Sequence, residues 1–200
     1  MFTEIPLIDL RAYRTILTDV DNQTIADQIL ADGKPVDPDD TAWQASGGTH
    51  TYYEDVLPPR TPEIAALEAA ITDAATEMLH KPYRITELWS ILTRPDQSIV
   101  AHNHRLNSHL HPLEFYSFAY YPLAPEGSAD LTFHVGYCHT IETCISVPVE
   151  PGALIVFNSF VWHFTERQTS SQDRLNVSGN LAPVHPDQSL TANWEPYWRR

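Results

Sequence analysis

Four histidines form two His-x-His pairs in the segment 89–121, at His102 and His104 and again at His109 and His111. Both pairs lie between stretches with the composition of β-strands. Residues i and i+2 of a strand point to the same face, so each pair could aim two imidazoles at one point. Imidazole nitrogen is a common ligand of transition metals. The pattern therefore predicts a metal site in which one of the two pairs takes part.

A second polar constellation follows in the segment 148–180. His163 lies six residues beyond the apolar run 153–157, and Arg174 follows eleven residues later. From Arg174 onward, Asn176 and Ser178 alternate with apolar residues. Alternation of this kind predicts a strand that presents a cation and two polar groups on a single face.

Taken together, these residues resemble the Fe(II)- and 2-oxoglutarate-dependent oxygenases. The resemblance spans residues 85–183, about half of the chain, and is carried by the order and spacing of its elements rather than by any one of them. Those elements are Trp89, His102-Asn103-His104, Ser117-Phe118-Ala119-Tyr120-Tyr121, Pro151-Gly152, Phe157-Asn158-Ser159, His163, Arg174 and Asn180-Leu181.

The resemblance implies that His102 and His163 are the two histidine ligands of an Fe(II) ion. In the broad superfamily a carboxylate usually lies two residues after the first histidine. Here that position is His104, which matches the branch of small oxygenases whose motif runs H-x-H, then His, then Arg. A histidine there permits a three-histidine site, or a two-histidine site with water in the third place. A three-histidine site is also compatible with copper or another ion. The pair His109 and His111 is the alternative, with Glu114 as a less regular source of a carboxylate; the distance from Trp89 favours the first pair.

Arg174 is the expected partner of the distal carboxylate of 2-oxoglutarate, because a guanidinium can bind a carboxylate through two parallel hydrogen bonds. Asn176 and Ser178 could each add a hydrogen bond to the co-substrate. A tyrosine of the neighbouring strand could also reach it, depending on which face the side chain takes; the candidates are Tyr116, Tyr120 and Tyr121.

The resemblance implies an oxygenase that uses Fe(II), 2-oxoglutarate and O2 to oxidise a small molecule or a peptide, with release of succinate and CO2. The alternative is a cupin-like metalloprotein without 2-oxoglutarate: another dioxygenase, a lyase or isomerase, or a ligand-binding domain. The orientation of Arg174 discriminates between them: a side chain that points into the barrel near the metal favours a co-substrate carboxylate, and one that points outward favours the second class. An outward Arg174 could pair with Glu166 or Asp173 at the surface.

Composition restricts the partners. The chain has 200 residues and a formal net charge of −14, from 26 acidic and 12 basic residues. This balance opposes binding to nucleic acids and to anionic membranes. The sequence has no leader-like start and no apolar run near 18 residues, so we expect a soluble, cytoplasmic protein. The two cysteines, Cys138 and Cys144, are expected to be buried thiols rather than a disulfide.

The elements that must position these side chains are mainly strands. We predict one domain, 1–200, that is mainly β with flanking helices. Its short strands suggest a sandwich or jelly roll, and the resemblance implies a double-stranded β-helix (jelly roll, cupin-like) core. Residues 1–84 would supply strands and supporting helices, 85–183 the catalytic core, and 184–200 a tail that packs on the barrel or at the contact of a homodimer. The expected strands are 2–10, 85–92, 98–102, 114–121, 129–135, 140–147, 153–157 and 175–180, and the expected helices are 13–30 and 61–80.

Overall fold

A computed structural model describes residues 10–32, 34–35, 54–104, 114–135 and 143–184. Within these ranges the chain forms two helices and eleven strands. In chain order they are β1 (Ala12–Ile16), α1 (Asn22–Asp32), β2 (Lys34–Pro35), β3 (Glu54–Leu57), α3 (Pro62–Leu79), β4 (Tyr83–Thr93), β5 (Ile99–His102), β6 (Tyr116–Leu123), β7 (Leu131–His134), β8 (Cys144–Val147), β9 (Ala153–Asn158), β10 (His163–Thr165) and β11 (Arg174–Pro183).

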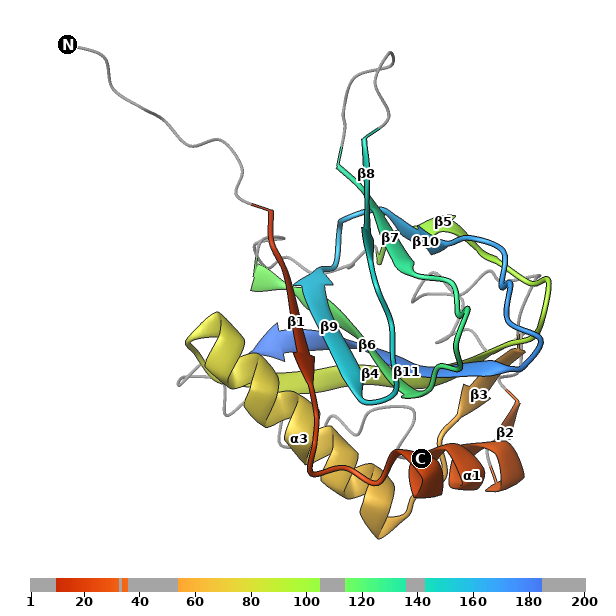
Figure 1. The fold of residues 1–200 in the computed structure, drawn as a ribbon. Helices are drawn as coiled ribbons and strands as arrows, with labels where there is room; N and C mark the ends of the chain where they lie inside the picture. The colour runs from red at the N-terminus through yellow and green to blue at the C-terminus, as the bar shows by residue number, and fades with distance from the viewer. Residues whose placement is uncertain (1–9, 33, 36–53, 105–113, 136–142, 185–200) are drawn as a thin grey trace.

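The described strands form two sheets that face each other. The larger sheet has the order β1-β9-β6-β11-β4-β3-β2, and the smaller has the order β5-β10-β7-β8. Figure 1 shows the smaller sheet on one side of the larger sheet and the two helices on the other. Each pairing between described strands is antiparallel. This two-sheet arrangement is the predicted jelly-roll architecture.

Helix α3 forms where the sequence predicts a helix. Thr61 precedes it as the N-cap, and its hydroxyl oxygen accepts a hydrogen bond from the backbone nitrogen of Ile64. His80 ends it in the left-handed conformation, with φ of 57°. The buried face of α3 carries Ile64, Leu67 and Ile71, which lie about one helical turn apart. This face anchors the helix to the outer surface of the larger sheet.

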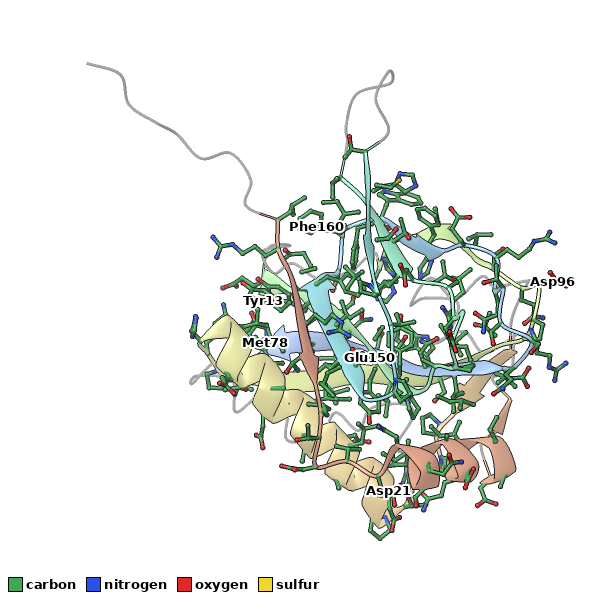
Figure 2. The ribbon with its side chains drawn as sticks, viewed as in Figure 1. Tyr13, Asp21, Met78, Asp96, Glu150 and Phe160 are labelled. Carbon is green, nitrogen blue, oxygen red and sulfur yellow. The ribbon has the colours of Figure 1, made fainter. Side chains whose placement is uncertain are left out.

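Two apolar cores result from this arrangement. The first lies between the larger sheet and the helices, where Tyr13 of β1 and Met78 of α3 pack against its rim (Figure 2). The second lies between the two sheets and includes Phe133 and Phe157, whose ring centroids are 4.9 Å apart. The face of each strand therefore decides which core its side chains enter, and the second core surrounds the candidate site.

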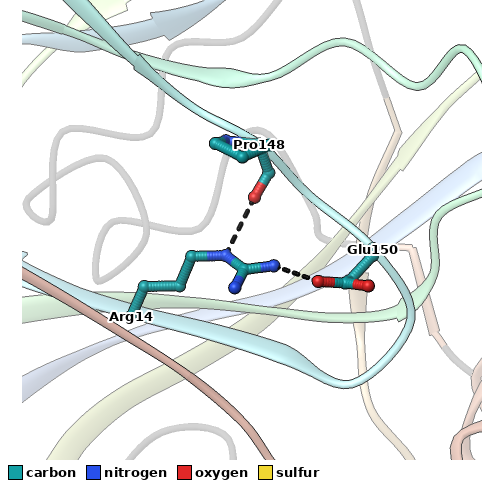
Figure 3. Close-up of polar contacts among 3 residues, drawn as sticks. All are labelled: Arg14, Pro148 and Glu150. Atoms are coloured by element: carbon teal, nitrogen blue, oxygen red, sulfur yellow. Dashed lines mark hydrogen bonds and ion pairs between the residues drawn. The ribbon is translucent and has the colours of Figure 1, made fainter.

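The predicted helix over residues 13–30 is wrong in its first part. Residues 12–16 form β1, an edge strand with alternating burial that pairs with β9. The helix begins only at Asn22, directly after Asp21, which accepts a hydrogen bond of 3.0 Å from the backbone nitrogen of Thr24. Arg14 fastens β1 to the connection that precedes β9: its Nε donates to the Pro148 carbonyl at 3.1 Å, and its guanidinium pairs with Glu150 (Figure 3).

The strand predictions from residue 85 onward each correspond to a described strand, with shifts of a few residues at the ends. The short strand β10 is an addition that the sequence pattern does not predict. Cys144 is a free, exposed cysteine, which contradicts the predicted burial of its thiol. Cys138, most of the predicted strand 2–10 and the tail from residue 185 lie outside the described residues. Neither described helix is long and apolar enough to cross a membrane.

Candidate metal and co-substrate site

Three of the predicted ligands meet inside the barrel. His102 is the last residue of β5, and it lies opposite His163, the first residue of β10. His104 follows two residues beyond β5, where its backbone nitrogen donates to the carbonyl of Ser159 at 2.8 Å. One nitrogen of each ring can be chosen so that all three lie within 4.8 Å of one another. Across the described ranges this is the one group of three or more His, Cys, Asp or Glu residues that could hold a metal ion.

The rings of His102 and His163 are oriented by their own strands. Nδ1 of His102 lies 2.8 Å from the carbonyl oxygen of Val100, and Nδ1 of His163 lies 2.9 Å from that of Val161. A carbonyl oxygen only accepts hydrogen bonds, so each Nδ1 carries the hydrogen and each Nε2 carries the lone pair. Outer hydrogen bonds of this kind fix the tautomer of metal-binding histidines.

His104 is oriented by side chains instead. Its Nδ1 lies 2.6 Å from Oδ1 of Asn180 and 2.8 Å from Oγ of Ser117. The indole ring of Trp89 packs beside it, with ring centroids 5.4 Å apart. The hydrogen bond to the amide oxygen of Asn180 again assigns the lone pair to Nε2. All three rings can therefore present Nε2 to a single ion.

The chemistry of this donor set fits a transition metal. Three neutral imidazoles suit Fe, Cu, Zn or Ni, whereas Mg and Ca prefer oxygen ligands. Burial lowers the pKa of His102 below its ordinary value, which favours the neutral, coordinating form of the ring.

The three histidines line one end of a small cavity between the two sheets. Its wall is mostly apolar, and β11 contributes two polar side chains to it, Asn176 and Ser178. The full lining is Trp89, Ile91, Ile99, His102, His104, Phe118, Ala119, Tyr121, Leu131, Phe157, His163, Phe164, Thr165, Asn176 and Ser178.

Arg174 lies behind the other end of the cavity and is completely buried. Its NH1 donates to the carbonyl of Ala129 at 2.7 Å, and its NH2 donates to the hydroxyls of Thr93 and Thr165 at 3.2 and 3.4 Å. It does not line the cavity itself, but Thr165 does, and so does Tyr121, whose ring centroid lies 5.8 Å from the guanidinium carbon.

The charge of Arg174 is not neutralised by any residue in the described part of the chain. Its hydrogen-bond acceptors are all uncharged, and its Nε has no acceptor. Burial consequently lowers the pKa of the guanidinium. The alternative expectation, a surface ion pair with Glu166 or Asp173, is wrong because Arg174 is buried. A buried cation without an anion is costly, so this position fits an anionic ligand.

The predicted alternation along β11 is confirmed. Asn176 and Ser178 face the cavity, and the Nδ2 of Asn176 donates to Oγ of Ser178 at 2.7 Å. The Oδ1 atom of Asn176 is buried without a hydrogen-bond partner. Leu175 and Val177 face the opposite core. A polar strip therefore connects the guanidinium to the histidines.

Of the three tyrosines considered, Tyr121 alone reaches the cavity. Tyr120 points to the other core, where its hydroxyl donates to the side-chain oxygen of Asn22. Tyr116 packs edge-on against Tyr83, with ring centroids 5.7 Å apart. Only Tyr121 therefore stays a candidate for contact with a co-substrate.

The alternative ligand pair can be placed only in part. His109 and His111 lie outside the described residues. Glu114 is described, and its carboxylate accepts a hydrogen bond from Lys81 at 2.8 Å rather than joining the histidine group.

One residue beside the site does not stand out in the sequence. Glu87 of β4 accepts a hydrogen bond from Nδ2 of Asn180, whose Oδ1 is in turn hydrogen-bonded to His104. Glu87 is therefore connected to His104 through Asn180. The sequence marks Glu87 only as an acidic residue that shares a strand face with Trp89 and Ile91. Both of those residues line the cavity. Burial raises the pKa of Glu87, while the hydrogen bond from Asn180 opposes that rise.

No protein-family model and no curated protein matches the sequence. Solved structures match its fold over most of its length. The epimerase SnoN from nogalamycin biosynthesis, described as non-heme and alpha-ketoglutarate-dependent, has a TM-score of 0.63 at 14% identity, covering 86% of this chain and 76% of that chain. A prolyl-4-hydroxylase from Pseudomonas putida has a TM-score of 0.58 at 14% identity, covering 87% of this chain and 93% of that chain.

HygX from Streptomyces hygroscopicus, solved with nickel and 2-oxoglutarate bound, has a TM-score of 0.57 at 14% identity, covering 82% of this chain and 78% of that chain. The predicted fold is therefore confirmed: the chain has the double-stranded β-helix fold of the 2-oxoglutarate- and Fe(II)-dependent oxygenases. At identities this low, the likeness establishes the fold and leaves the activity to be argued from the site.

Proposed function

We propose that this protein is an Fe(II)- and 2-oxoglutarate-dependent oxygenase acting on a small-molecule or peptide substrate. The observation that carries the proposal is the pairing of two sites at one cavity. Three histidines whose Nε2 atoms can share one ion lie at one end. A buried guanidinium without a carboxylate partner in the described structure lies behind the other end, in contact with the lining residues Thr165 and Tyr121. A metal-chelating dicarboxylate satisfies both ends at once.

Each end has a defined task in this proposal. His102, His104 and His163 hold the metal ion through Nε2. Arg174 binds the distal carboxylate of 2-oxoglutarate, with the hydroxyl of Thr165 close to the same position. A guanidinium and a carboxylate brought together in a water-poor site form strong, charge-assisted hydrogen bonds.

The mostly apolar wall of the cavity disfavours water around the reaction. Trp89, Ile91, Ile99 and Leu131 are among the apolar side chains that line the cavity. When bound, an iron ion with 2-oxoglutarate and O2 would supply the oxidising chemistry, with succinate and CO2 as the products of the co-substrate. The side chains orient the co-substrate and exclude solvent around it.

The outcome for the primary substrate is not set by the fold. The structural neighbours include proteins described as an epimerase, a carbocyclase and a prolyl-4-hydroxylase, so one fold accommodates several reactions. Hydroxylation is the simplest outcome and the one we propose first.

The all-histidine donor set is the observation that favours the second candidate, a cupin-like metalloprotein that does not use 2-oxoglutarate. Three imidazoles are not selective for iron. The placement of Arg174 weighs against this candidate, because a metal site without an acidic co-substrate gives no reason to bury a cation in the barrel.

The test is co-substrate turnover. Purified protein with Fe(II), ascorbate and 2-oxoglutarate under air should release succinate, and His163→Ala should abolish the release. His134→Ala is the matched control, because His134 lies on β7 outside the cavity lining. Absence of succinate, together with absence of 2-oxoglutarate binding by calorimetry in the presence of Mn(II), would reject the proposal in favour of the second candidate.

A further inference from the structure

Three side chains from neighbouring strands form a hydrogen-bonded row beneath His104. Asn180 of β11 lies opposite Glu87 of β4 on one side and opposite Ser117 of β6 on the other. The amide of Asn180 donates through Nδ2 to Glu87 and accepts through Oδ1 from His104 and Ser117. Ser117 is also within 2.9 Å of the hydroxyl of Ser159.

The hydrogen bonds in this row have a fixed direction when Glu87 is ionised. A carboxylate only accepts hydrogen bonds, so the NH2 group of Asn180 must face Glu87. The oxygen of the same amide must then face His104. An amide oxygen also only accepts, so Nδ1 of His104 must carry the hydrogen and Nε2 the lone pair.

His104 differs from the other two histidines in its need for this support. His102 and His163 each bond a backbone carbonyl two residues earlier, which does not depend on any other side chain. His104 lies beyond the end of β5 and depends on the side chains of Asn180 and Ser117. Its tautomer is therefore set by residues on other strands.

We infer that Glu87, acting through Asn180, is a positioning residue that holds His104 in the tautomer able to bind a metal through Nε2. The inference rests on the proposed function, because it assigns to Glu87 a part in building the same metal site. It also accounts for how a histidine can occupy the ligand position where a carboxylate is usual. The carboxylate here lies two hydrogen bonds away and orients the imidazole.

The isosteric variant Glu87→Gln tests the direction of the hydrogen bonds that link Glu87, Asn180 and His104. Glutamine can donate as well as accept, so the amide of Asn180 is free to turn over and present its NH2 group to His104. That arrangement places the hydrogen on Nε2 and blocks coordination. We expect the affinity for Mn(II) or Co(II), measured by calorimetry, to fall about 10- to 100-fold, the range typical for loss of an outer partner of a ligand.

The double variant Glu87→Gln with Asn180→Asp should restore binding. An aspartate at position 180 only accepts, so the glutamine amide at position 87 donates to it, and Nδ1 of His104 again carries the hydrogen. We expect metal affinity near that of the wild type. A purely structural role for Glu87 predicts no such rescue, because the second substitution adds no packing.

The tautomer itself can be read without metal. In metal-free wild-type protein, the ¹⁵N resonances of the His104 ring should report hydrogen on Nδ1. In Glu87→Gln they should report hydrogen mainly on Nε2, because a 10-fold or greater loss of affinity requires that tautomer in at least about nine molecules in ten. Glu77→Gln, which removes the same charge from an exposed position on α3, is the control and should behave as wild type.

The outcomes separate this inference from the proposed function. If the wild type binds metal and Glu87→Gln binds it equally well with an unchanged tautomer, the inference is wrong and the oxygenase proposal stands. If the wild type binds no divalent metal, the proposed function fails, and the ring resonances still decide whether Glu87 sets the tautomer.

A second pair of variants guards against misfolding of Glu87→Gln. Asn180→Asp alone keeps the acceptor that His104 needs and should retain metal affinity, although two neighbouring carboxyl groups will lower stability. Asn180→Leu has a similar size but no acceptor, and should lose affinity to the extent expected for Glu87→Gln. Equal metal affinity in these two variants would overturn the inference.

Discussion

The Arg174→Met variant should lose most of its affinity for 2-oxoglutarate, while the free energy of unfolding of the free protein changes little. In the free protein the guanidinium makes one short hydrogen bond, to Ala129, and two longer ones to threonine hydroxyls. Removing it leaves the Ala129 carbonyl without this donor, which costs about 1–3 kcal/mol. It also removes a buried, unneutralised charge, whose burial costs on the order of several kcal/mol. Because the two effects oppose each other, we expect a change of no more than about 2 kcal/mol in the free energy of unfolding.

The effect on 2-oxoglutarate should be much larger. A carboxylate bound by the guanidinium gains two charge-assisted hydrogen bonds of about 1.5–3 kcal/mol each. Their sum is about 3–6 kcal/mol, and each 1.4 kcal/mol corresponds to a factor of about ten in Kd. We therefore expect Arg174→Met to weaken 2-oxoglutarate binding by about 10²- to 10⁴-fold.

Thermal unfolding measures both quantities. With Mn(II) and without O2, 2-oxoglutarate at about 100 times its Kd should stabilise the wild type by about 2.7 kcal/mol. For a protein of this length that is a rise in Tm of roughly 5–10 °C. At the same concentration Arg174→Met should gain about 0.4 kcal/mol or less, a shift of roughly 1 °C.

Two further variants sharpen this experiment. Arg174→Lys keeps the charge without the planar fork and should give an intermediate shift. Arg167→Met removes an arginine whose side chain is 72% exposed, and should keep the full shift. The reasoning is refuted if Arg174→Met keeps the full shift in Tm, or if it unfolds the free protein as severely as a core truncation.

Three more outcomes are expected. His163→Ala should lower Mn(II) affinity by at least about 100-fold by calorimetry while the protein stays folded by circular dichroism, because one of three ligands is lost. Gly179→Ala should destabilise the protein by about 1–3 kcal/mol in denaturant unfolding, because the added Cβ would collide with the carbonyl of Glu87 and lie 2.6 Å from the ring of Phe118. Burial raises the pKa of Glu87, so the metal-free wild type should lose stability relative to Glu87→Gln as pH rises from about 4.5 through the raised pKa. A difference in stability that is constant across that pH range would contradict the assigned burial of this carboxyl group.

The residues that can be predicted from the sequence are those whose chemistry shows in a local pattern. The row Arg174, Asn176 and Ser178 alternates with apolar residues, and a period of two is enough to assign all three to one face. Helix α3 begins after the N-cap residue Thr61, and its apolar residues recur about once per helical turn. These features depend on neighbours a few positions away, which the sequence shows directly.

The sequence predicts that His102 and His104 lie close together, but the reason it gives is partly wrong. The pattern places both on one face of a strand, but β5 ends at His102 and His104 lies in the following segment. The two rings still approach, with centroids 5.5 Å apart, because Ser159 holds the backbone of His104 in place. That contact joins residues far apart in the chain, and no local pattern reports it.

Strand β10 and Glu87 escape detection for related reasons. A strand of three residues, His163–Thr165, is too short to show a period, and aromatic neighbours of this kind are typical of core. Glu87 gains its meaning only from its register with Asn180, 93 positions away. Register between distant strands is a property of the tertiary structure.

The position of β11 has a consequence for how the protein is made. This last described strand lies between β4 and β6, so the larger sheet cannot close until it has been synthesised. Before that moment β4 and β6 present unpaired edges to each other across a gap, and pairings of such long sequence separation form slowly. The nascent chain therefore keeps these two strand edges unpaired until β11 has been synthesised, and chaperone dependence during expression should decline once β11 has left the ribosome.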